Sequence, residues 1–279
     1  MNETTSLFRC PNCAAPLIRG AGAYRCGNNH SFDIAAAGYT HLLVANQKNS
    51  KNPGDDKAMV AARTAFLDAG YYAPLRDALC AVTVEACADK ESPAVLDCGC
   101  GEGYYTAGVA AALDKAEIRA HVAGIDISKF ALKKAAKRLK EGEFAVASAY
   151  HLPLADESAD VLLNVFSPLA LEEFARVLKP GGTFVYVVPS DLHLWEMKQV
   201  LYEKPYENEV RRDDYPGFAY VGVKQVRENI HLTCSEHIMA LFGMTPYAWK
   251  TPKKGVDKLK AMATLDCQIG FDVHIYKKA

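Results

Sequence analysis

A glycine-rich turn between an apolar strand and a helix start is the segment of this sequence best suited to hold a ligand. The run Gly99-Cys-Gly-Glu-Gly103 follows the apolar pair Val95 and Leu96. Glycine lets the backbone approach a ligand without a side-chain clash, and free N–H groups at a helix N-terminus attract negative charge. A second apolar run ends at Asp126, whose carboxylate can accept hydrogen bonds from both hydroxyls of a ribose. The segment therefore predicts a site for a nucleoside cofactor.

Four residues near the N-terminus have the types and spacing of a zinc site. Cys10-Pro-Asn-Cys13 and Cys26-Gly-Asn-Asn-His30 provide three thiolates and one imidazole in two close pairs, and each pair can take one side of a tetrahedral Zn²⁺ ion. So short a segment has too little apolar content to fold without such a staple. Four protein ligands leave no open coordination position, so the sequence predicts a structural zinc module and not a catalytic metal.

The other six cysteines show no paired spacing typical of metal ligands; they stand at positions 80, 87, 98, 100, 234 and 267. Cys98 and Cys100 flank Gly99, where small side chains suit a tight turn. The alternative is a catalytic thiolate that attacks a pyrimidine ring. No basic residue adjoins these thiols in the sequence, which favours the first interpretation.

The composition is typical of a globular protein in a reducing compartment. The 279 residues are 50% hydrophobic and 23% charged, with a formal net charge of −1. No apolar run approaches the roughly 18 residues of a membrane span, and the first residues lack the layout of a signal peptide. We therefore expect a cytoplasmic protein without a membrane partner. The length permits more than one domain.

Positive charge is concentrated in the first part of the chain. Residues 1–63 carry seven Lys and Arg against four Asp and Glu, and Lys48, Lys51 and Arg63 belong to this excess. The excess is either ordinary surface scatter or a face directed at a polyanion. A second basic run over 133–140 falls on a predicted helix, and we interpret it as a solvated face rather than a nucleic-acid patch.

Alternating helices and strands must position these residues. The pattern predicts helices over 57–69, 75–88, 129–139, 169–178 and a capped helix over 235–242, and strands over 143–147, 159–166, 183–188 and 271–276. Residues 189–204 indicate a loop and a helix, and residues 220–232 an extended segment that pairs with the last strand. Ligands of α/β sheets bind at the carboxyl ends of the strands. Ser148 and Ala149 are therefore expected beside the adenine, and residues 164–168 beside the group that is modified.

Several phrases of the sequence carry a family resemblance. They are the zinc spacing together with HSFDIAAAGYTHLL, NPGDD, ARTAFLDAGYYAPLRDAL, VLDCGCGEGYYT and GMTPYAW. With these, the chain from about Cys10 to the C-terminus resembles the bacterial 23S ribosomal RNA guanine-N(1)-methyltransferases, which modify a hairpin loop of the large subunit. The glycine turn and the phrase LKPGG are similar to those of class I S-adenosylmethionine methyltransferases. One departure is NVFSP over 164–168, which lacks the arginine of some members.

The resemblance implies an α/β fold: a class I S-adenosylmethionine methyltransferase (Rossmann-like) domain with a small N-terminal zinc-binding module. Residues 1–45 would form the zinc module and help to recognise RNA, residues 46–88 a linker and helices that pack on the core, and residues 89–279 the methyltransferase domain. The implied cofactors are S-adenosylmethionine and structural Zn²⁺. The implied partners are a 23S ribosomal RNA hairpin and, in a homodimer, a second copy of the chain.

Site residues follow from the motifs and the resemblance together. The expected zinc ligands are Cys10, Cys13, Cys26 and His30. The expected cofactor-binding residues are Tyr71, Asp97, Gly99, Gly101, Glu102, Gly103, Asp126, Ile127, Ser148, Ala149, His193 and Leu194. Tyr71 stands where the family has an aromatic ring that reaches the cofactor, and His193 with Leu194 matches the loop that closes it.

Methylation of guanine N(1) sets further demands on the site. The nitrogen carries a proton that must be removed while the lone pair is aligned with the methyl group. Asp55, Asp56 and Asp191 are carboxylates of the right type, and the sequence assigns none of them as the base. The guanine must also leave its stack, which calls for an aromatic platform; Tyr104, Phe166 and Trp195 are the alternatives.

Two other functions remain open at the level of sequence. An enzyme of the same fold could act on a small molecule or a protein, with the zinc module as a docking element. A binding module without a cofactor is less favoured, because every loop expected to touch the cofactor has suitable residues.

Overall fold

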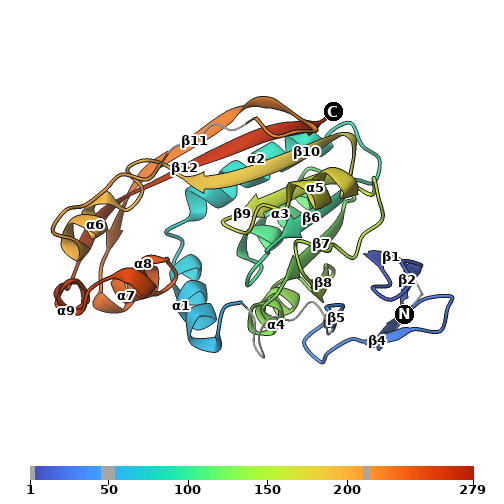
Figure 1. Ribbon diagram of the computed structural model, residues 1–279, viewed down its shortest axis with the longest axis horizontal. Coiled ribbons are helices and arrows are strands. Elements are labelled where there is room, and N and C mark those ends of the chain that lie inside the picture. The colour runs from blue at the N-terminus through green and yellow to red at the C-terminus, as the bar shows by residue number, and fades with distance from the viewer. Residues whose placement is uncertain (1–3, 45–53, 210–213) are drawn as a thin grey trace.

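A mixed eight-stranded sheet is the centre of the protein, as seen in a computed structural model that describes residues 4–44, 54–209 and 214–279. Its strand order is β11-β12-β10-β9-β6-β7-β8-β5 (Figure 1). The parallel strands are β5 (Tyr39–His41), β6 (Ala94–Cys98), β7 (His121–Asp126), β8 (Glu143–Val146), β9 (Ala159–Val165) and β10 (Leu178–Pro189). The order reverses beside β6, so the ends of β6 and β9 flank the switch point where α/β sheets bind ligands.

Two long antiparallel strands close one edge of the sheet. β12 (Leu265–Lys278) lies between β10 and β11 (Phe218–Leu232) and pairs with both. The expected antiparallel pair is therefore present, and both strands are longer than the sequence pattern indicated. The phrase LKPGG belongs to β10, where the register with β9 shifts between Leu178 and Thr183.

Apolar side chains alternate between two faces of the sheet, as the pleat requires. Val161 and Leu163 of β9 join the core cluster of α2 (Ala73–Cys87) and α3 (Tyr104–Lys115), whereas Leu162 joins the cluster of α5 (Leu171–Val177). The remaining helices of this half are α1 (Lys57–Asp68) and α4 (Lys129–Arg138). Their bounds agree with the expected helices to within a few residues.

The N-terminal segment covers part of the second face. It forms a four-stranded antiparallel sheet of β1 (Thr4–Arg9), β2 (Pro16–Arg19), β3 (Ala23–Arg25) and β4 (Ser31–Asp33). Phe8, Leu17 and Tyr24 are buried in the same cluster as Leu96 and Leu162 of the large sheet. The next strand, β5, pairs with β8, so a part of residues 1–45 belongs to the large sheet.

Four short helices complete the C-terminal part: α6 (Trp195–Leu201), α7 (Ser235–Gly243), α8 (Tyr247–Lys250) and α9 (Lys253–Lys260). The sequence predicted α6 and α7 and missed α8 and α9. The cap of α7 differs from the expectation, because Cys234 is the N-cap and makes no side-chain hydrogen bond there. Among the described residues, no helix is long and apolar enough to cross a membrane.

Candidate active site

A cavity of about 940 Å³ lies at the carboxyl ends of the central strands. The turns after β6, β7, β8 and β9 contribute to its wall, as do α1 and the segment between α7 and α8. Of the twelve expected cofactor-binding residues, all line this cavity except Tyr71 and Gly103. Gly103 is the N-cap of α3 with a φ of 81°, and a Cβ there would lie 2.8 Å from Cα of Ala135.

Asp126 ends β7 and faces the glycine turn. Its Oδ2 accepts the backbone N–H of Gly101 at 2.9 Å, and its Oδ1 accepts that of Ser128 at 2.7 Å. Burial raises the pKa of Asp126 above its usual value. Each oxygen keeps a second lone pair, so the carboxylate can accept from two further hydroxyl groups. This is the arrangement that a ribose diol requires.

Asp97 lies at the end of β6 and is buried, with 1% of its surface exposed. Its Oδ2 accepts from the hydroxyl of Thr106 at 2.5 Å, and its Oδ1 has no hydrogen-bond partner among the described residues. Burial raises the pKa of Asp97 to about 7. An orphaned carboxylate oxygen at a cavity wall favours a cationic ligand, because a nearby positive charge would offset its desolvation.

Glu102 in the glycine turn is buried and has a structural partner. Its Oε2 accepts from the guanidinium of Arg138 at 2.6 Å, and Arg138 also pairs with Asp68 at 2.9 Å. Oε1 of Glu102 has no hydrogen-bond partner among the residues described here. The ion pairs tie the turn to α4 and α1, and the free oxygen remains for a ligand.

Phe166 lies on a strained turn after β9, beside the glycine turn, and lines the same cavity. Its φ of 55° is left-handed, and its side chain is 49% exposed. The turn is held on both sides, because Nδ2 of Asn164 donates to the carbonyl of Pro168 at 3.0 Å and Oγ of Ser167 donates to that of Cys98 at 2.6 Å. A non-glycine residue in this conformation persists only where its surroundings fix it, and such strain is typical of functional sites.

A buried pair, Tyr72 and His193, borders the same space. Nδ1 of His193 accepts the N–H of Gly270 at 3.2 Å, which leaves Nε2, 3.4 Å from the hydroxyl of Tyr72, as the protonated nitrogen. Burial lowers the pKa of His193 to about 3, so the ring is neutral. The expected aromatic contact, Tyr71, instead makes a 2.8 Å hydrogen bond to His237 outside the cavity lining, and its neighbour Tyr72 takes the place at the wall.

The candidate bases are separated by the structure. Asp55 lines the cavity, where it pairs with Arg63 and its carbonyl accepts from Ser128 at 2.6 Å. Asp56 caps α1 by accepting from Met59, and Asp191 accepts from Leu192; neither lines the cavity.

Two of the three candidate aromatic platforms, Tyr104 and Phe166, line the cavity, and Trp195 does not. The sequence interpretation missed Tyr105, Met244, Tyr247 and Trp249 as lining residues. Arg63, which the sequence interpretation assigns to the basic excess, also lines the cavity. Lys48 and Lys51 of the same excess lie outside the described residues.

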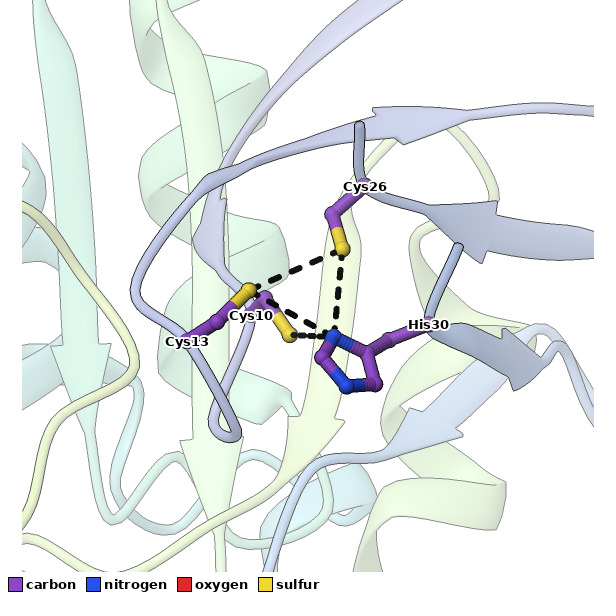
Figure 2. A group of neighbouring side chains, drawn as sticks. All are labelled: Cys10, Cys13, Cys26 and His30. Carbon is purple, nitrogen blue, oxygen red and sulfur yellow. Dashed lines mark hydrogen bonds between the residues drawn. The ribbon is translucent and has the colours of Figure 1, made fainter. Parts of the chain in front are cut away.

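The expected metal ligands converge in the N-terminal module (Figure 2). Nδ1 of His30 lies 3.5, 3.4 and 3.5 Å from the sulfur atoms of Cys10, Cys13 and Cys26, and the sulfurs of Cys13 and Cys26 are 3.8 Å apart. A tetrahedral zinc ion with bonds of about 2.3 Å to sulfur and 2.0 Å to nitrogen has ligand edges of about 3.5 and 3.8 Å. The four residues therefore fit Zn²⁺, with no position open for a substrate.

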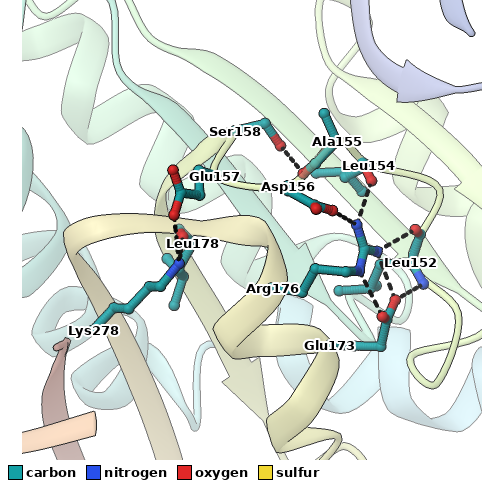
Figure 3. A network of polar contacts seen from close by, with 10 residues as sticks. All are labelled: Leu152, Leu154, Ala155, Asp156, Glu157, Ser158, Glu173, Arg176, Leu178 and Lys278. Carbon is teal, nitrogen blue, oxygen red and sulfur yellow. Dashed lines mark hydrogen bonds and ion pairs between the residues drawn. The ribbon is translucent and has the colours of Figure 1, made fainter. Parts of the chain in front are cut away.

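The zinc module contacts the loop that follows β8. The N–H of Arg9 donates to the carbonyl of Pro153 at 2.7 Å, and Phe8 forms a β-bridge with Leu154. From the other side Arg176 of α5 donates to the carbonyls of Leu152 and Leu154, both at 2.9 Å (Figure 3).

Arg176 itself is oriented by a two-pronged pair with Glu173, at 2.7 Å for both contacts. The loop begins with Ser148 and Ala149, so these contacts brace one wall of the cavity.

Comparisons with known proteins agree with this geometry. Residues 89–247 match the family described as "Methyltransferase domain", and residues 8–51 match "RlmA, N-terminal". The chain is 35% identical over 247 residues to a 23S rRNA (guanine(748)-N(1))-methyltransferase of Streptomyces fradiae, covering 87% of this chain and 85% of that protein. The chain belongs to the 23S rRNA guanine-N(1)-methyltransferase family. It is also 32% identical over 281 residues, covering 98% of both chains, to a Bacillus subtilis protein named "Putative 23S rRNA (guanine-N(1)-)-methyltransferase YxjB".

Membership in this family confirms several predictions. The fold class, the enzyme class and the expected cofactors, S-adenosylmethionine and zinc, are those of the family, and the described Cys10, Cys13, Cys26 and His30 lie in the segment that matches its zinc ribbon. The assignment of each cofactor contact and the division at residues 45 and 88 stay predictions.

Proposed function

We propose that this protein transfers the methyl group of S-adenosylmethionine to N(1) of a guanine in a hairpin loop of 23S ribosomal RNA. The observation that carries the proposal is one cavity lined both by polar groups suited to the cofactor and by an exposed aromatic ring. The polar groups are those of Asp97, Gly101 and Asp126, and the ring is that of Phe166, in the turn that packs beside Gly99. The names of the relatives from Streptomyces fradiae and Bacillus subtilis support the substrate.

The polar groups of the cavity fit the cofactor one by one. The unpartnered oxygen of Asp97 would accept from the ammonium group of the methionine part, and Asp126 would accept from both ribose hydroxyls. Ser148 and Ala149 would border the adenine. Bound in this way, S-adenosylmethionine supplies an electrophilic methyl group on its sulfonium.

The exposed ring of Phe166 suits a flat aromatic base. We propose that a flipped guanine stacks on Phe166, whose ring packs beside that of Phe271 at 5.6 Å between centroids. Stacking would hold N(1) in line with the methyl group that the cofactor would supply, and the proton of N(1) would pass to solvent water as the methyl group is transferred.

The cavity offers few groups that could take this proton. In the described part of the chain its carboxylates are Asp55, Asp97, Glu102 and Asp126, and the last three are among the residues expected to hold the cofactor. Asp55 is also held by Arg63. We therefore assign no side chain as the base, and propose that alignment of the guanine supplies most of the acceleration.

Mass spectrometry tests the proposal directly. A 23S rRNA hairpin is incubated with the protein and S-adenosylmethionine, and its nucleosides are analysed. We expect 1-methylguanosine, and we expect none with the Asp126→Ala variant at low cofactor concentration. Methylation of another base or position, or of no RNA at all, would contradict the proposal and leave a same-fold enzyme with a small-molecule or protein substrate.

The assembly and location of the enzyme stay proposals. We propose that the enzyme is a homodimer, on the basis of the family resemblance. We also propose that it is cytoplasmic, on the basis of the amino-acid composition. Light scattering during size-exclusion chromatography measures the mass in solution, for which a monomer is 30.4 kDa. A mass near this value would contradict the homodimer and leave the chemistry of the cavity unaffected.

A further inference from the structure

The cavity rim carries an exposed tryptophan next to a dense run of lysines. Trp249 on α8 is 72% exposed and lines the cavity together with Tyr247. The following segment, 250–260, contains five lysines and one acidic residue, in a chain whose net charge is −1. Tryptophan usually buries much of its large ring, so an exposed one beside a cavity indicates a contact surface.

Helix α9 is fixed firmly enough to present these charges. Gly255 and Leu259 are buried, and a Cβ on Gly255 would lie 2.3 Å from the carbonyl oxygen of Leu201 in α6. The glycine therefore allows α9 to lie directly on α6. Lys253, Lys254, Lys258 and Lys260 are exposed on this helix.

Two acidic residues offset part of this charge and leave a net excess of three. Lys254 pairs with Glu203 at 3.2 Å, and Asp257 lies on the same helix. Among the described residues, Lys250, Lys253, Lys258 and Lys260 form no ion pair, so they are available to a polyanion.

We infer that Trp249 and the α8–α9 lysines form the surface that grips the RNA beside the target guanine, with the indole stacked on an unpaired base and the lysines on its phosphates. This inference rests on the proposed function. Two features favour RNA as the occupant: the charge is complementary to phosphate, and the surface is continuous with the cavity that would receive the base.

The position of the α8–α9 surface makes it a second contact area for the RNA, separate from the zinc module. α8 and α9 lie at the opposite end of the molecule from the zinc module (Figure 1). An RNA hairpin that contacts both would cross the molecule between them, and the cavity wall formed by residues 244–247 lies next to α8. The basic excess before residue 64 would then be one of two contact areas.

Two pairs of charge-removing variants test the lysines. Lys253→Ala with Lys258→Ala is compared with Lys133→Ala and Lys137→Ala, which removes the same charge from exposed positions of α4. Binding of a 23S rRNA hairpin is measured by filter binding over several salt concentrations. We expect the slope of log affinity against log salt to fall by about 1.4–1.8 for the α9 pair and to stay unchanged for the α4 pair. Equal slopes in both pairs would overturn the inference.

Trp249 has its own readout, since the chain contains only two tryptophans. In a Trp195→Phe background, hairpin RNA should quench the fluorescence of Trp249, and Trp249→Ala should weaken RNA binding by about 5- to 150-fold. Trp249→Phe should restore most of this affinity.

Controls separate the inference from the proposed function. Wild-type protein that methylates the hairpin, with unchanged RNA affinity in the Trp249→Ala and α9 variants, would overturn the inference alone. Wild-type protein that neither binds nor methylates the hairpin would overturn both. Variants that bind the hairpin normally and lose binding only to the protein-containing large subunit would show a protein-docking surface instead.

Discussion

Arg9 and Pro153 are joined by a backbone hydrogen bond of 2.7 Å, which links the zinc module to the loop that starts at the cavity wall. Phe8, Leu17 and Tyr24 of the module are buried against the large sheet. The module is therefore packed into the methyltransferase core. Its metal should consequently stabilise more than its own strands.

Loss of zinc is expected to destabilise the whole protein. Cys10→Ser with Cys13→Ser should release the metal and lower the free energy of unfolding by more than about 3 kcal/mol, a fall in Tm of roughly 6–12 °C. Calorimetry and metal analysis measure both effects. Cys80→Ser, which changes a half-buried cysteine outside the zinc cluster, is the control. A metal-free variant with the Tm of the wild type would show that the module is an independent appendage.

Asp97 should make the stability of the cofactor-free protein depend on pH. Burial raises its pKa to about 7, above the value of about 3.9 in an unfolded chain, so the folded state binds the proton more tightly. Stability from this group is then present at low pH and falls as the pH rises from about 4 to 7. Asp97→Asn should remove this fall, which is at most about 4 kcal/mol, and should weaken cofactor binding.

Thermal melts between pH 5 and 8 follow the first effect, and titration calorimetry follows the second. A variant that is both less stable than the wild type at pH 8 and equally able to bind the cofactor would argue against this role of Asp97.

Phe166→Ala should act on the RNA substrate and not on the cofactor. The ring is exposed on a turn fixed by Asn164 and Ser167, so its removal takes away a preformed platform. We expect kcat/KM for RNA to fall by an amount equivalent to roughly 1–3 kcal/mol of transition-state stabilisation. The affinity for S-adenosylmethionine should change little. Steady-state kinetics with a hairpin substrate give the first quantity. Phe166→Tyr should retain activity; a large defect in that variant would point to a role other than stacking.

Arg176→Ala should weaken cofactor binding from a distance. The guanidinium holds two carbonyls of the loop that begins at Ser148, and its side chain is only 31% exposed. Loss of these charge-assisted contacts should cost roughly 2–4 kcal/mol of stability and lower the affinity for S-adenosylmethionine. Lys278→Ala, which removes a neighbouring contact to the carbonyl of Leu178, is the matched control. Equal cofactor affinities in the two variants would contradict the bracing role.

The site residues that lie at strand ends and in short turns were the most predictable part of the protein. Parallel strands end at one edge of a sheet, which brings the glycine turn, Asp97 and Asp126 together. The apolar runs that predict these strands are local features of the sequence. The zinc ligands were predictable for a similar reason, since the spacing within each pair fixes a small turn.

Contacts between distant segments were harder to predict. β5 is only three residues long, and its place beside β8 depends on a partner far along the chain. Likewise Tyr72 rather than Tyr71 reaches the cavity because α2 begins at Ala73 and sets which ring turns inward. α8 and α9 are only four and eight residues long, too short for a helical period to repeat clearly in the sequence, and the packing of α9 on α6 through Gly255 joins segments far apart in the chain.

The contact between Ser6 and Glu143, 137 positions apart, has a consequence for how the chain is made. Synthesis delivers the zinc ribbon first, while the strands that will cover Phe8 and Leu17 are still absent. Pairings of such large sequence separation form late and slowly. During synthesis the apolar side of the ribbon is therefore exposed to solvent. Early zinc binding would keep the ribbon folded until the strands of the large sheet are synthesised.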